Sequence, residues 1–195
     1  MLPPVWSAKV KLCIITSHMA SWNPFPPPSD YSPFKEISLD WITGLPVSIR
    51  NGQAYDSILM IVCCVMKHAL FLPTQEDATA VDFTEMFFKH VECHFGTPRG
   101  IMSDRDSHIT SDFWHEVCKI QMIKRRMSTA YHPQTNGQSK ALNQIIEDYL
   151  QAYMAKDQTV WAHLLPLAQF TYNNSRNHTT GMSPNHLLFG FDCNI

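Results

Sequence analysis

The 195-residue chain is 45% hydrophobic and 16% charged, which excludes a disordered chain and is sufficient for one buried core. Its 15 Lys and Arg against 17 Asp and Glu give a formal charge of -2, so any contact with a phosphate backbone requires a local basic patch. The six cysteines form no C-x-x-C pair, which favours reduced thiols. With no convincing signal peptide or membrane span, we expect an intracellular protein that is not secreted.

The N-terminal region lacks a sustained hydrophobic period. Residues 1–33 end in a proline-rich run, a composition typical of an extended linker or a degenerate tail. We therefore expect the folded domain to occupy residues 34–190 and a short C-terminal stub to follow at residues 191–195.

Three strands are expected first. Apolar and polar side chains alternate along residues 37–41, which places Asp40 on the opposite strand face from the apolar side chains. The dipeptide Asn51-Gly52 marks a turn, and the apolar runs 57–65 and 67–72 predict two further buried strands.

Helices and strands are then expected to alternate. Thr79 with Asp82 resembles a capping box, and the helix it begins should stop at Gly96. Short strands are predicted at residues 100–103 and 123–127. Three more helices are expected over residues 111–121, 138–155 and 157–172, the last kinked at Pro166. This order indicates an α/β fold with a mixed sheet covered on both faces.

Two aspartates are candidates for metal binding. Asp40 lies on a predicted central strand, and Asp104 follows directly after another. Open α/β sheets gather ligands at the carboxyl ends of their strands, so these two carboxylates can converge on one cation. Helix caps and turns are the ordinary alternative for aspartates near strand ends.

The sequence around these aspartates is more specific than the aspartates themselves. In chain order it contains ISLDWITGLP (37–46), SDR (103–105), STAYHPQTNGQ (128–138), LLPLA (164–168), YNNS (172–175) and TGMSP (180–184). In order and spacing these motifs resemble those of the integrase catalytic core of gypsy-class LTR retrotransposons (Metaviridae type), over about residues 34–190. The resemblance implies a ribonuclease-H-like fold of the retroviral-integrase superfamily, with a mixed five-stranded sheet flanked by helices.

The resemblance also implies a chemistry. Family members are polynucleotidyl transferases in which two aspartates and a glutamate hold two Mg²⁺ or Mn²⁺ ions. Asp40 matches the first aspartate and Asp104 the second, both as metal ligands. The implied partner is DNA, both the element's ends and the target, with RNA as a further candidate. A homo-oligomer in the nucleus or cytoplasm is expected.

The third carboxylate is absent at its expected place. Because residues 128–138 match the family without a gap, the glutamate position falls on Lys140. A protonated lysine has no lone pair for a metal and repels a cation. We therefore expect a catalytically impaired integrase core. Two alternatives stay open: an active transferase rescued by another carboxylate or a partner chain, and a domesticated non-enzymatic module that binds nucleic acid or protein.

Two stretches are candidates for nucleic-acid contact. Lys124, Arg125 and Arg126 form a basic cluster near a strand start, with a solvated face as the alternative. The loop of residues 131–138 borders the active site and touches DNA in the family, with a plain connection as the alternative. The candidate residues in and beside this loop are His132, Gln134, Thr135, Asn136, Gln138 and Lys140.

One further group has a spacing that suits a metal. His90, Cys93 and His94 are related as i, i+3 and i+4, which brings side chains together on a regular α-helix. Ordinary packing and surface roles are the favoured interpretation.

Overall fold

The computed structural model describes residues 32–103, 124–127 and 159–194. The helices predicted over 111–121 and 138–155, the loop of residues 131–138 and almost all of the predicted linker lie outside these residues. So do Asp104 and Lys140.

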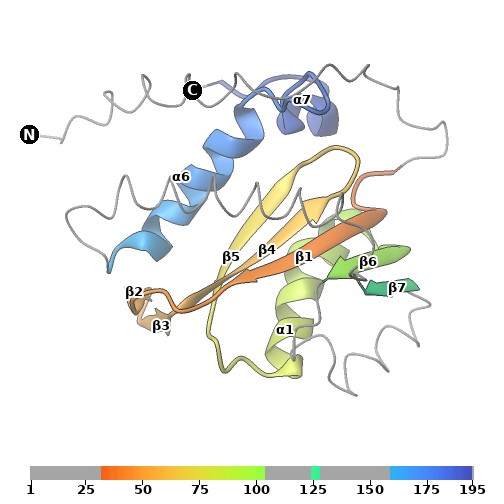
Figure 1. The fold of residues 1–195 in the computed structure, drawn as a ribbon. Helices are drawn as coiled ribbons and strands as arrows, with labels where there is room; N and C mark the ends of the chain where they lie inside the picture. The colour runs from red at the N-terminus through yellow and green to blue at the C-terminus, as the bar shows by residue number, and fades with distance from the viewer. Residues whose placement is uncertain (1–31, 104–123, 128–158, 195) are drawn as a thin grey trace, which may run out of the picture.

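Five strands form one mixed sheet in the order β5-β4-β1-β6-β7 (Figure 1). β1 pairs antiparallel with β4 and parallel with β6, and the outer pairs are antiparallel β4–β5 and parallel β6–β7. The predicted mixed five-stranded sheet is therefore confirmed. The strands are β1 (Glu36–Ile42), β4 (Ser57–Cys63), β5 (Ala69–Thr74), β6 (Gly100–Ser103) and β7 (Lys124–Met127).

The predicted turn at Asn51-Gly52 joins two short strands that were not predicted. β2 (Ser48–Arg50) pairs with β3 (Gln53–Tyr55) as a separate hairpin. Asn51 and Gly52 both have positive φ, 53° and 79°, as the type I′ turn of a two-residue hairpin requires. The three-residue strands are too short for a period to be visible in the sequence.

The boundary between β4 and β5 differs from the prediction. The apolar runs 57–65 and 67–72 suggested almost continuous strands, but β4 ends at Cys63 and β5 begins at Ala69. Lys67, with φ of 60°, donates its backbone N–H to the Cys63 carbonyl at 2.9 Å. No glycine or proline marks this turn, so sequence patterning alone misplaced it.

One face of the sheet is covered by a helical layer that begins as predicted. The capping box of Thr79 and Asp82 is present at the start of α1 (Ala80–Phe87). The single predicted helix is nevertheless interrupted by a π-helical turn, η2 (Phe88–Glu92), before the short α2 (Cys93–Phe95) ends at Gly96. The side chains buried between this layer and the sheet include Ile37, Leu39, Leu59, Ile61, Phe83, Phe87 and Val91.

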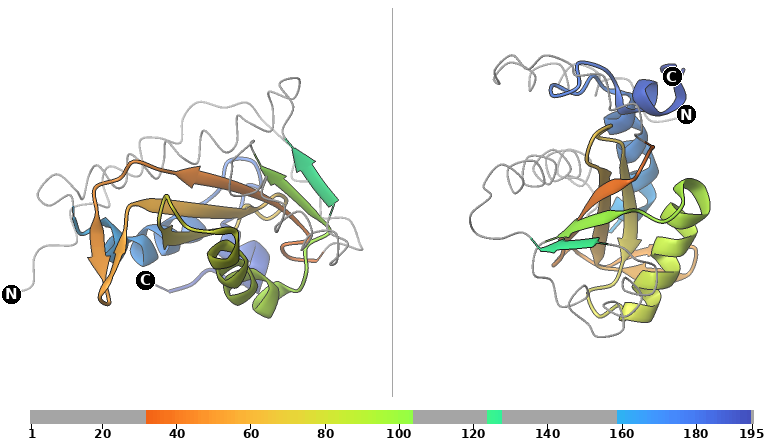
Figure 2. Two further views of the ribbon diagram at one scale, coloured as in Figure 1. Left: turned by 90° about the horizontal axis from the view of Figure 1, so that it is seen from below. Right: turned by 90° about the vertical axis from the view of Figure 1, so that its right-hand side faces the viewer.

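The opposite face is covered by α6 (Trp161–Asn174), which lies along β5 (Figure 1), and α7 (Pro184–Phe189) packs against α6. Successive β4 residues alternate between the two layers, so Ile58 and Met60 pack with Trp161 and Leu165. Pro166 is exposed, and α6 continues through it as one helix. Figure 2 shows β7 at the sheet edge opposite the one against which α6 packs. Both faces are thus covered, as predicted.

The start of α6 is held by the β2–β3 hairpin. Its N-cap residue, Val160, makes no side-chain cap bond. Instead the buried Ser48 hydroxyl accepts the Ala162 N–H at 3.3 Å and donates to the Thr159 carbonyl. Trp161 donates its indole N–H to the Pro46 carbonyl at 2.6 Å. Residues more than a hundred positions apart in sequence therefore replace a local cap.

Among the described residues, no helix is long and apolar enough to cross a membrane. The described cysteines, Cys63, Cys64, Cys93 and Cys193, are free thiols, as expected.

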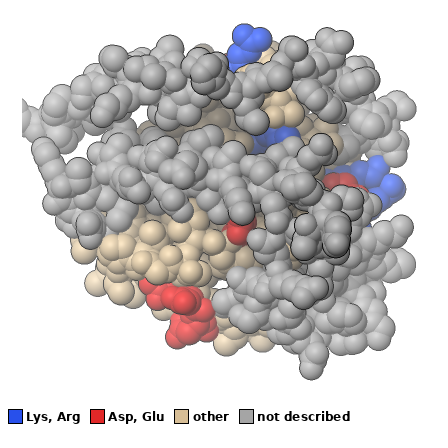
Figure 3. All heavy atoms as spheres, in the orientation of Figure 1, with Lys and Arg blue, Asp and Glu red and all other residues tan. Residues whose placement is uncertain are grey.

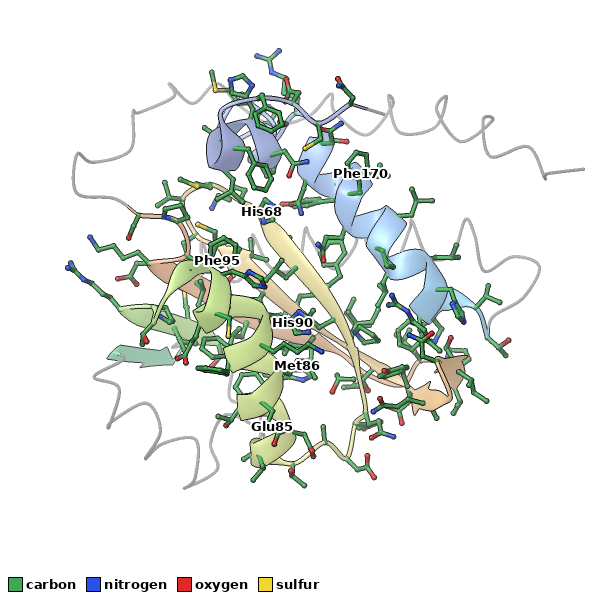
Figure 4. The ribbon with its side chains drawn as sticks, turned by 180° about the vertical axis from the view of Figure 1, so that it is seen from behind. His68, Glu85, Met86, His90, Phe95 and Phe170 are labelled. Carbon is green, nitrogen blue, oxygen red and sulfur yellow. The ribbon has the colours of Figure 1, made fainter. Side chains whose placement is uncertain are left out.

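His68 is a buried polar group between the β4–β5 turn and α7 (Figure 4). Its ring packs edge-on to Phe34 and Phe189, with centroids 5.8 and 6.1 Å away. Its Nδ1 has no hydrogen-bond partner among the described residues. Burial lowers the pKa of His68 from 6.5 to about 4, although a side-chain hydrogen bond to Asn185 opposes the shift.

We expect His68 to make the fold acid-sensitive. Because its folded pKa is depressed, the unfolded chain binds more protons between pH 6.5 and 4, so stability present above pH 6.5 is lost as the pH falls through that window. The loss is about 3 kcal/mol at most. Chemical denaturation at pH 7.5 and 4.5 measures it. His68→Phe should flatten the pH dependence and His178→Gln, at an exposed histidine, should not; equal slopes in all three proteins would contradict the assignment.

Candidate active site

Asp40 lies within β1, on the sheet face covered by α6. Its neighbours Leu39 and Trp41 pack on the other face against the α1 layer, which confirms the predicted alternation. The carboxylate is partly exposed, and its Oδ1 accepts the Trp41 backbone N–H at 2.9 Å. This bond stabilises the ionised carboxylate beside the backbone of a central strand.

The register between β1 and β6 determines what Asp40 can meet. The two strands are parallel, and their last paired residues are Leu39 and Ser103. The next residue on β1 is Asp40, and the next residue in the sequence after Ser103 is Asp104. Asp40 therefore lies at the carboxyl end of β6, the end at which open α/β sheets place their ligands. The positions of Asp104 and Lys140 fall outside the described residues.

The carboxylate of Asp40, at the carboxyl end of β6, suits a hard divalent cation. Aspartate carboxylates are the ligands that Mg²⁺ and Mn²⁺ prefer. Within residues 32–103, 124–127 and 159–194, no group of three or more His, Cys, Asp or Glu side chains could hold a metal. Asp40 thus needs ligands from outside those ranges to form a metal site.

The helical histidines and cysteine do not form such a group in the described part of the chain either. Their i, i+3, i+4 spacing presupposes a regular α-helix, but His90 lies in the π-helical turn and Cys93 begins the next helix. The wider π turn changes which side chains share a face. Burial and the neighbouring Lys89 and His94 lower the pKa of His90, which favours a neutral ring in a packed helical layer.

The predicted basic cluster lies on the edge strand β7, with Lys124 at its start as expected. Lys124 is level with Gly100 on β6, which is itself level with Glu36 on β1. At about 3.3 Å per residue, this level is about 13 Å along the strands from that of Asp40. The cluster therefore begins at the opposite end of the sheet from the candidate active site.

The motif YNNS was recognised in the sequence, but the hydrogen bonds made by its two asparagine side chains were not predicted. Asn173 is buried; its Oδ1 accepts the Ala69 N–H and its Nδ2 donates to the Ala69 carbonyl, each at 2.8 Å. One helical turn earlier, Gln169 accepts the Phe71 N–H at 2.8 Å. The third outward position on this edge of β5 is Pro73, which has no N–H. The edge of β5 is thus closed to further strand pairing.

The adjacent amide holds the end of the described chain. Asn174 donates to the Cys193 carbonyl at 2.9 Å and accepts the Cys193 N–H at 3.0 Å. Asp192 likewise accepts a hydrogen bond from the Ser183 hydroxyl. Ser183 also caps α7 by accepting the His186 N–H at 3.0 Å. The motifs YNNS and TGMSP therefore have a structural role in part, because their side chains make hydrogen bonds at the ends of α6 and α7.

Comparison with known proteins relates both the sequence and the fold to others. The transposon Tf2-3 and Tf2-4 polyproteins of Schizosaccharomyces pombe (strain 972) are each 32% identical over 158 residues, or 81% of this chain. The chain spans about 12% of the length of these curated relatives. No protein-family model matches it.

Solved structures share the fold at lower identity. The simian T-cell lymphotropic virus intasome in complex with PP2A regulatory subunit B56 gamma matches with a TM-score of 0.63 and 16% identity, over 80% of this chain and 55% of that chain. The BIV integrase catalytic core domain matches with 0.61 and 19%, over 80% and 95%. The HTLV-2 integrase catalytic core domain in complex with magnesium, in trimeric form, matches with 0.58 and 16%, over 78% and 95%.

The mixed sheet, its covering helices and these likenesses define a ribonuclease-H-like integrase catalytic core fold. Within that class, the chain belongs to the integrase cores of LTR retrotransposons, as its sequence motifs indicated.

Proposed function

We propose that this chain is a DNA-binding integrase core whose polynucleotidyl transferase activity is lost or strongly reduced. The observation that carries the proposal is the parallel register of Leu39 with Ser103, because the next residue after each of them is an aspartate. Two adjacent strands thus lead to the two carboxylates that the family's chemistry uses, while the sequence has Lys140 at the third position.

Asp40 and Asp104 would hold the metal through their carboxylate oxygens. Bound Mg²⁺ or Mn²⁺ ions activate the attacking water or 3′-hydroxyl and stabilise the charge on the reacting phosphate. The hydrogen bond from the Trp41 N–H to Asp40 at 2.9 Å restricts the carboxylate before any ion binds. The HTLV-2 core solved with magnesium supports the same ion class.

Lys140 would act against the second ion. Unit charges 4 Å apart interact by about 4 kcal/mol at an effective dielectric of 20, and a divalent ion doubles that figure. Rotation of the long side chain relieves the repulsion without supplying a ligand. One loosely held ion is the expected state of the site.

The proposed ligand is DNA, namely the element's ends and its target. The proposed contacts are the basic cluster and the 131–138 loop with His132, Gln134, Thr135, Asn136 and Gln138. A homo-oligomer within the cell, able to reach nuclear DNA, is proposed because related cores form an intasome and dimeric or trimeric assemblies. We also propose that residues 34–190 form the core and residues 1–33 a linker.

A crystal structure of the protein with Mn²⁺ tests the site. The two aspartate carboxyl groups should lie within about 8 Å, the reach of ligands shared around metals roughly 4 Å apart. A larger separation would remove the metal-site assignment, whatever the protein's affinity for DNA.

The basic cluster gives a prediction about binding. Reversing the charges of Lys124, Arg125 and Arg126 to Glu should weaken DNA binding and lower its salt dependence, because each lost phosphate contact removes about one unit from the slope of log K against log salt. Fluorescence anisotropy with a labelled duplex at several salt concentrations measures the slope. An unchanged slope would show that the cluster is only a solvated face.

A further inference from the structure

We propose that an apolar surface beside α7 is a docking site for the proline-rich segment of the same chain, residues 20–31. Three side chains form this surface, which we call the α7 surface: Met182, Phe189 and Phe191. The inference goes beyond the proposed function, because the contact uses neither a metal nor DNA. The contact fixes how the chain approaches the first strand of the core.

The α7 surface consists of large apolar side chains that are exposed. Met182 is 49% exposed, Phe189 53% and Phe191 60%. The ring centroids of Phe189 and Phe191 lie 6.1 Å apart. Met182 and Phe191 immediately precede Ser183 and Asp192, whose side chains are hydrogen-bonded to each other, so the three side chains belong to one surface. Contiguous apolar side chains, unlike single ones, mark an interaction site.

Ring contacts connect the α7 surface to the place where the chain enters the core. Phe189 packs edge-on to His68, with centroids 6.1 Å apart, and His68 packs edge-on to Phe34 at 5.8 Å. Phe34 is buried and stacks on Phe95 at 4.0 Å. Figure 4 labels His68 and Phe95 at this end of the sheet. The chain therefore enters the core three ring contacts away from Phe191.

The entry is a tight turn that contains a strained residue. The Lys35 N–H donates to the Ser32 carbonyl at 3.3 Å, which closes a four-residue turn with Pro33 in second place. The third residue, Phe34, has φ of 56°, a conformation that is unfavourable for a bulky side chain and that glycine or asparagine normally adopts. Burial of the Phe34 ring offsets this strain. Because a tight turn reverses the chain, the segment before Ser32 is directed alongside the domain.

The sequence of residues 20–31 suits an aromatic surface. It contains Trp22, Phe25 and four prolines, and its one charged residue is Asp30. Proline-rich segments favour the extended polyproline II conformation, and they dock on aromatic surfaces with little loss of entropy. Phe25 lies nine positions before the buried Phe34, and an extended chain of that length covers about 30 Å. That length is enough to reach the α7 surface.

The charges near the α7 surface are compatible with this segment. In Figure 3 the charged side chains visible at the end of the molecule where Figure 1 places α7 are basic. Asp192, next to Phe191 in the sequence, accepts a hydrogen bond from Ser183, and its Oδ2 lies 3.5 Å from Nδ1 of His186. The described carboxylate at this surface thus already has partners, and the single carboxylate of Asp30 is tolerated there.

Photo-crosslinking of the full chain tests the contact. With p-benzoylphenylalanine in place of Phe25, irradiation should form a crosslink to residues 182–191 of the same molecule, which peptide mass spectrometry locates. Phe191→Ser should lose most of that crosslink. Phe88→Ser is the matched control and should keep it, because Phe88 is 57% exposed but lies in the helical layer on the other face of the sheet. Thermal melts verify that both variants fold.

A peptide-binding measurement does not depend on those two variants. A labelled peptide with the sequence of residues 20–31 should bind the Trp22→Ser/Phe25→Ser chain at least about tenfold more tightly than the native chain. In the native chain the tethered segment competes with the peptide at a high effective concentration. Fluorescence anisotropy measures both affinities.

Three results would overturn the proposal. The first is a crosslink from position 25 that goes elsewhere, is absent, or is unchanged in Phe191→Ser. The second is a crosslink that forms only between two molecules, which mixing isotope-labelled and unlabelled chains detects, and which would assign the α7 surface to a second copy. The third is equal affinity of the peptide for the native chain and for Trp22→Ser/Phe25→Ser, which would show that the native segment does not occupy the surface.

Discussion

Lys140→Glu is expected to restore divalent-metal binding before it restores DNA joining. The substitution removes a cation that repels the metal and supplies the carboxylate that the family places there, so both changes act in one direction. We expect at least a tenfold gain in Mn²⁺ affinity by isothermal titration calorimetry, the fold-change equivalent to about 1.4 kcal/mol.

Lys140→Gln separates the two contributions, because it removes the charge without supplying a carboxylate. Its affinity should lie between those of the native chain and Lys140→Glu. Adding Asp40→Asn to Lys140→Glu should abolish the gain. If the native chain already binds two Mn²⁺ ions as tightly as Lys140→Glu, then Lys140 does not occupy the third ligand position. Recovery of binding without activity would instead indicate a further lesion. The first candidate is Asp106, which adds a negative charge two residues after Asp104 in the sequence.

Asn173→Ala is expected to cause a large loss of folding stability. Asn173 is 2% exposed and satisfies both backbone groups of Ala69 at 2.8 Å. Removing the amide leaves a buried N–H and a buried carbonyl without partners, at a cost of about 1–3 kcal/mol each. A total of about 2–6 kcal/mol is a large part of the stability of a typical domain.

Asn174→Ala is the matched control, since it truncates the neighbouring amide on the same helix. Its two bonds to Cys193 are only partly buried, so we expect a smaller loss. Urea unfolding measures both variants, and light scattering should show more self-association in Asn173→Ala because the edge of β5 becomes available for pairing. Equal losses in the two variants would show that closing this edge contributes little.

The parts of the fold that sequence predicted depend on local patterns. Alternation along residues 37–41 placed Asp40 on the correct face of β1, and the capping box marked the start of α1. The π-helical turn was missed because Phe88–Glu92 contains neither glycine nor proline. The same lack of a marker hid the turn between β4 and β5.

The parts that sequence missed depend on partners far apart in the chain. Asn173 hydrogen-bonds to the backbone of Ala69, and Ser48 caps α6. Both contacts join residues far apart in the sequence, so no local hydrophobic period predicts them. The motifs shared with the family made Asp40 a candidate site residue, but only the register of β1 with β6 shows that Asp40 lies at the carboxyl end of β6. The same register shows that the basic cluster begins at the far end of the sheet, which composition could not reveal.

The central proposal is that this integrase core has the two aspartates of a metal site, Asp40 and Asp104, but Lys140 in place of the third ligand. A strand-transfer assay with the unmodified chain, labelled element-end DNA and Mg²⁺ or Mn²⁺ tests it most directly. We predict no joined product above the metal-free background. Robust strand transfer by the unmodified chain that Asp104→Asn abolishes would contradict the proposal, because it would show a complete active site without a carboxylate at residue 140.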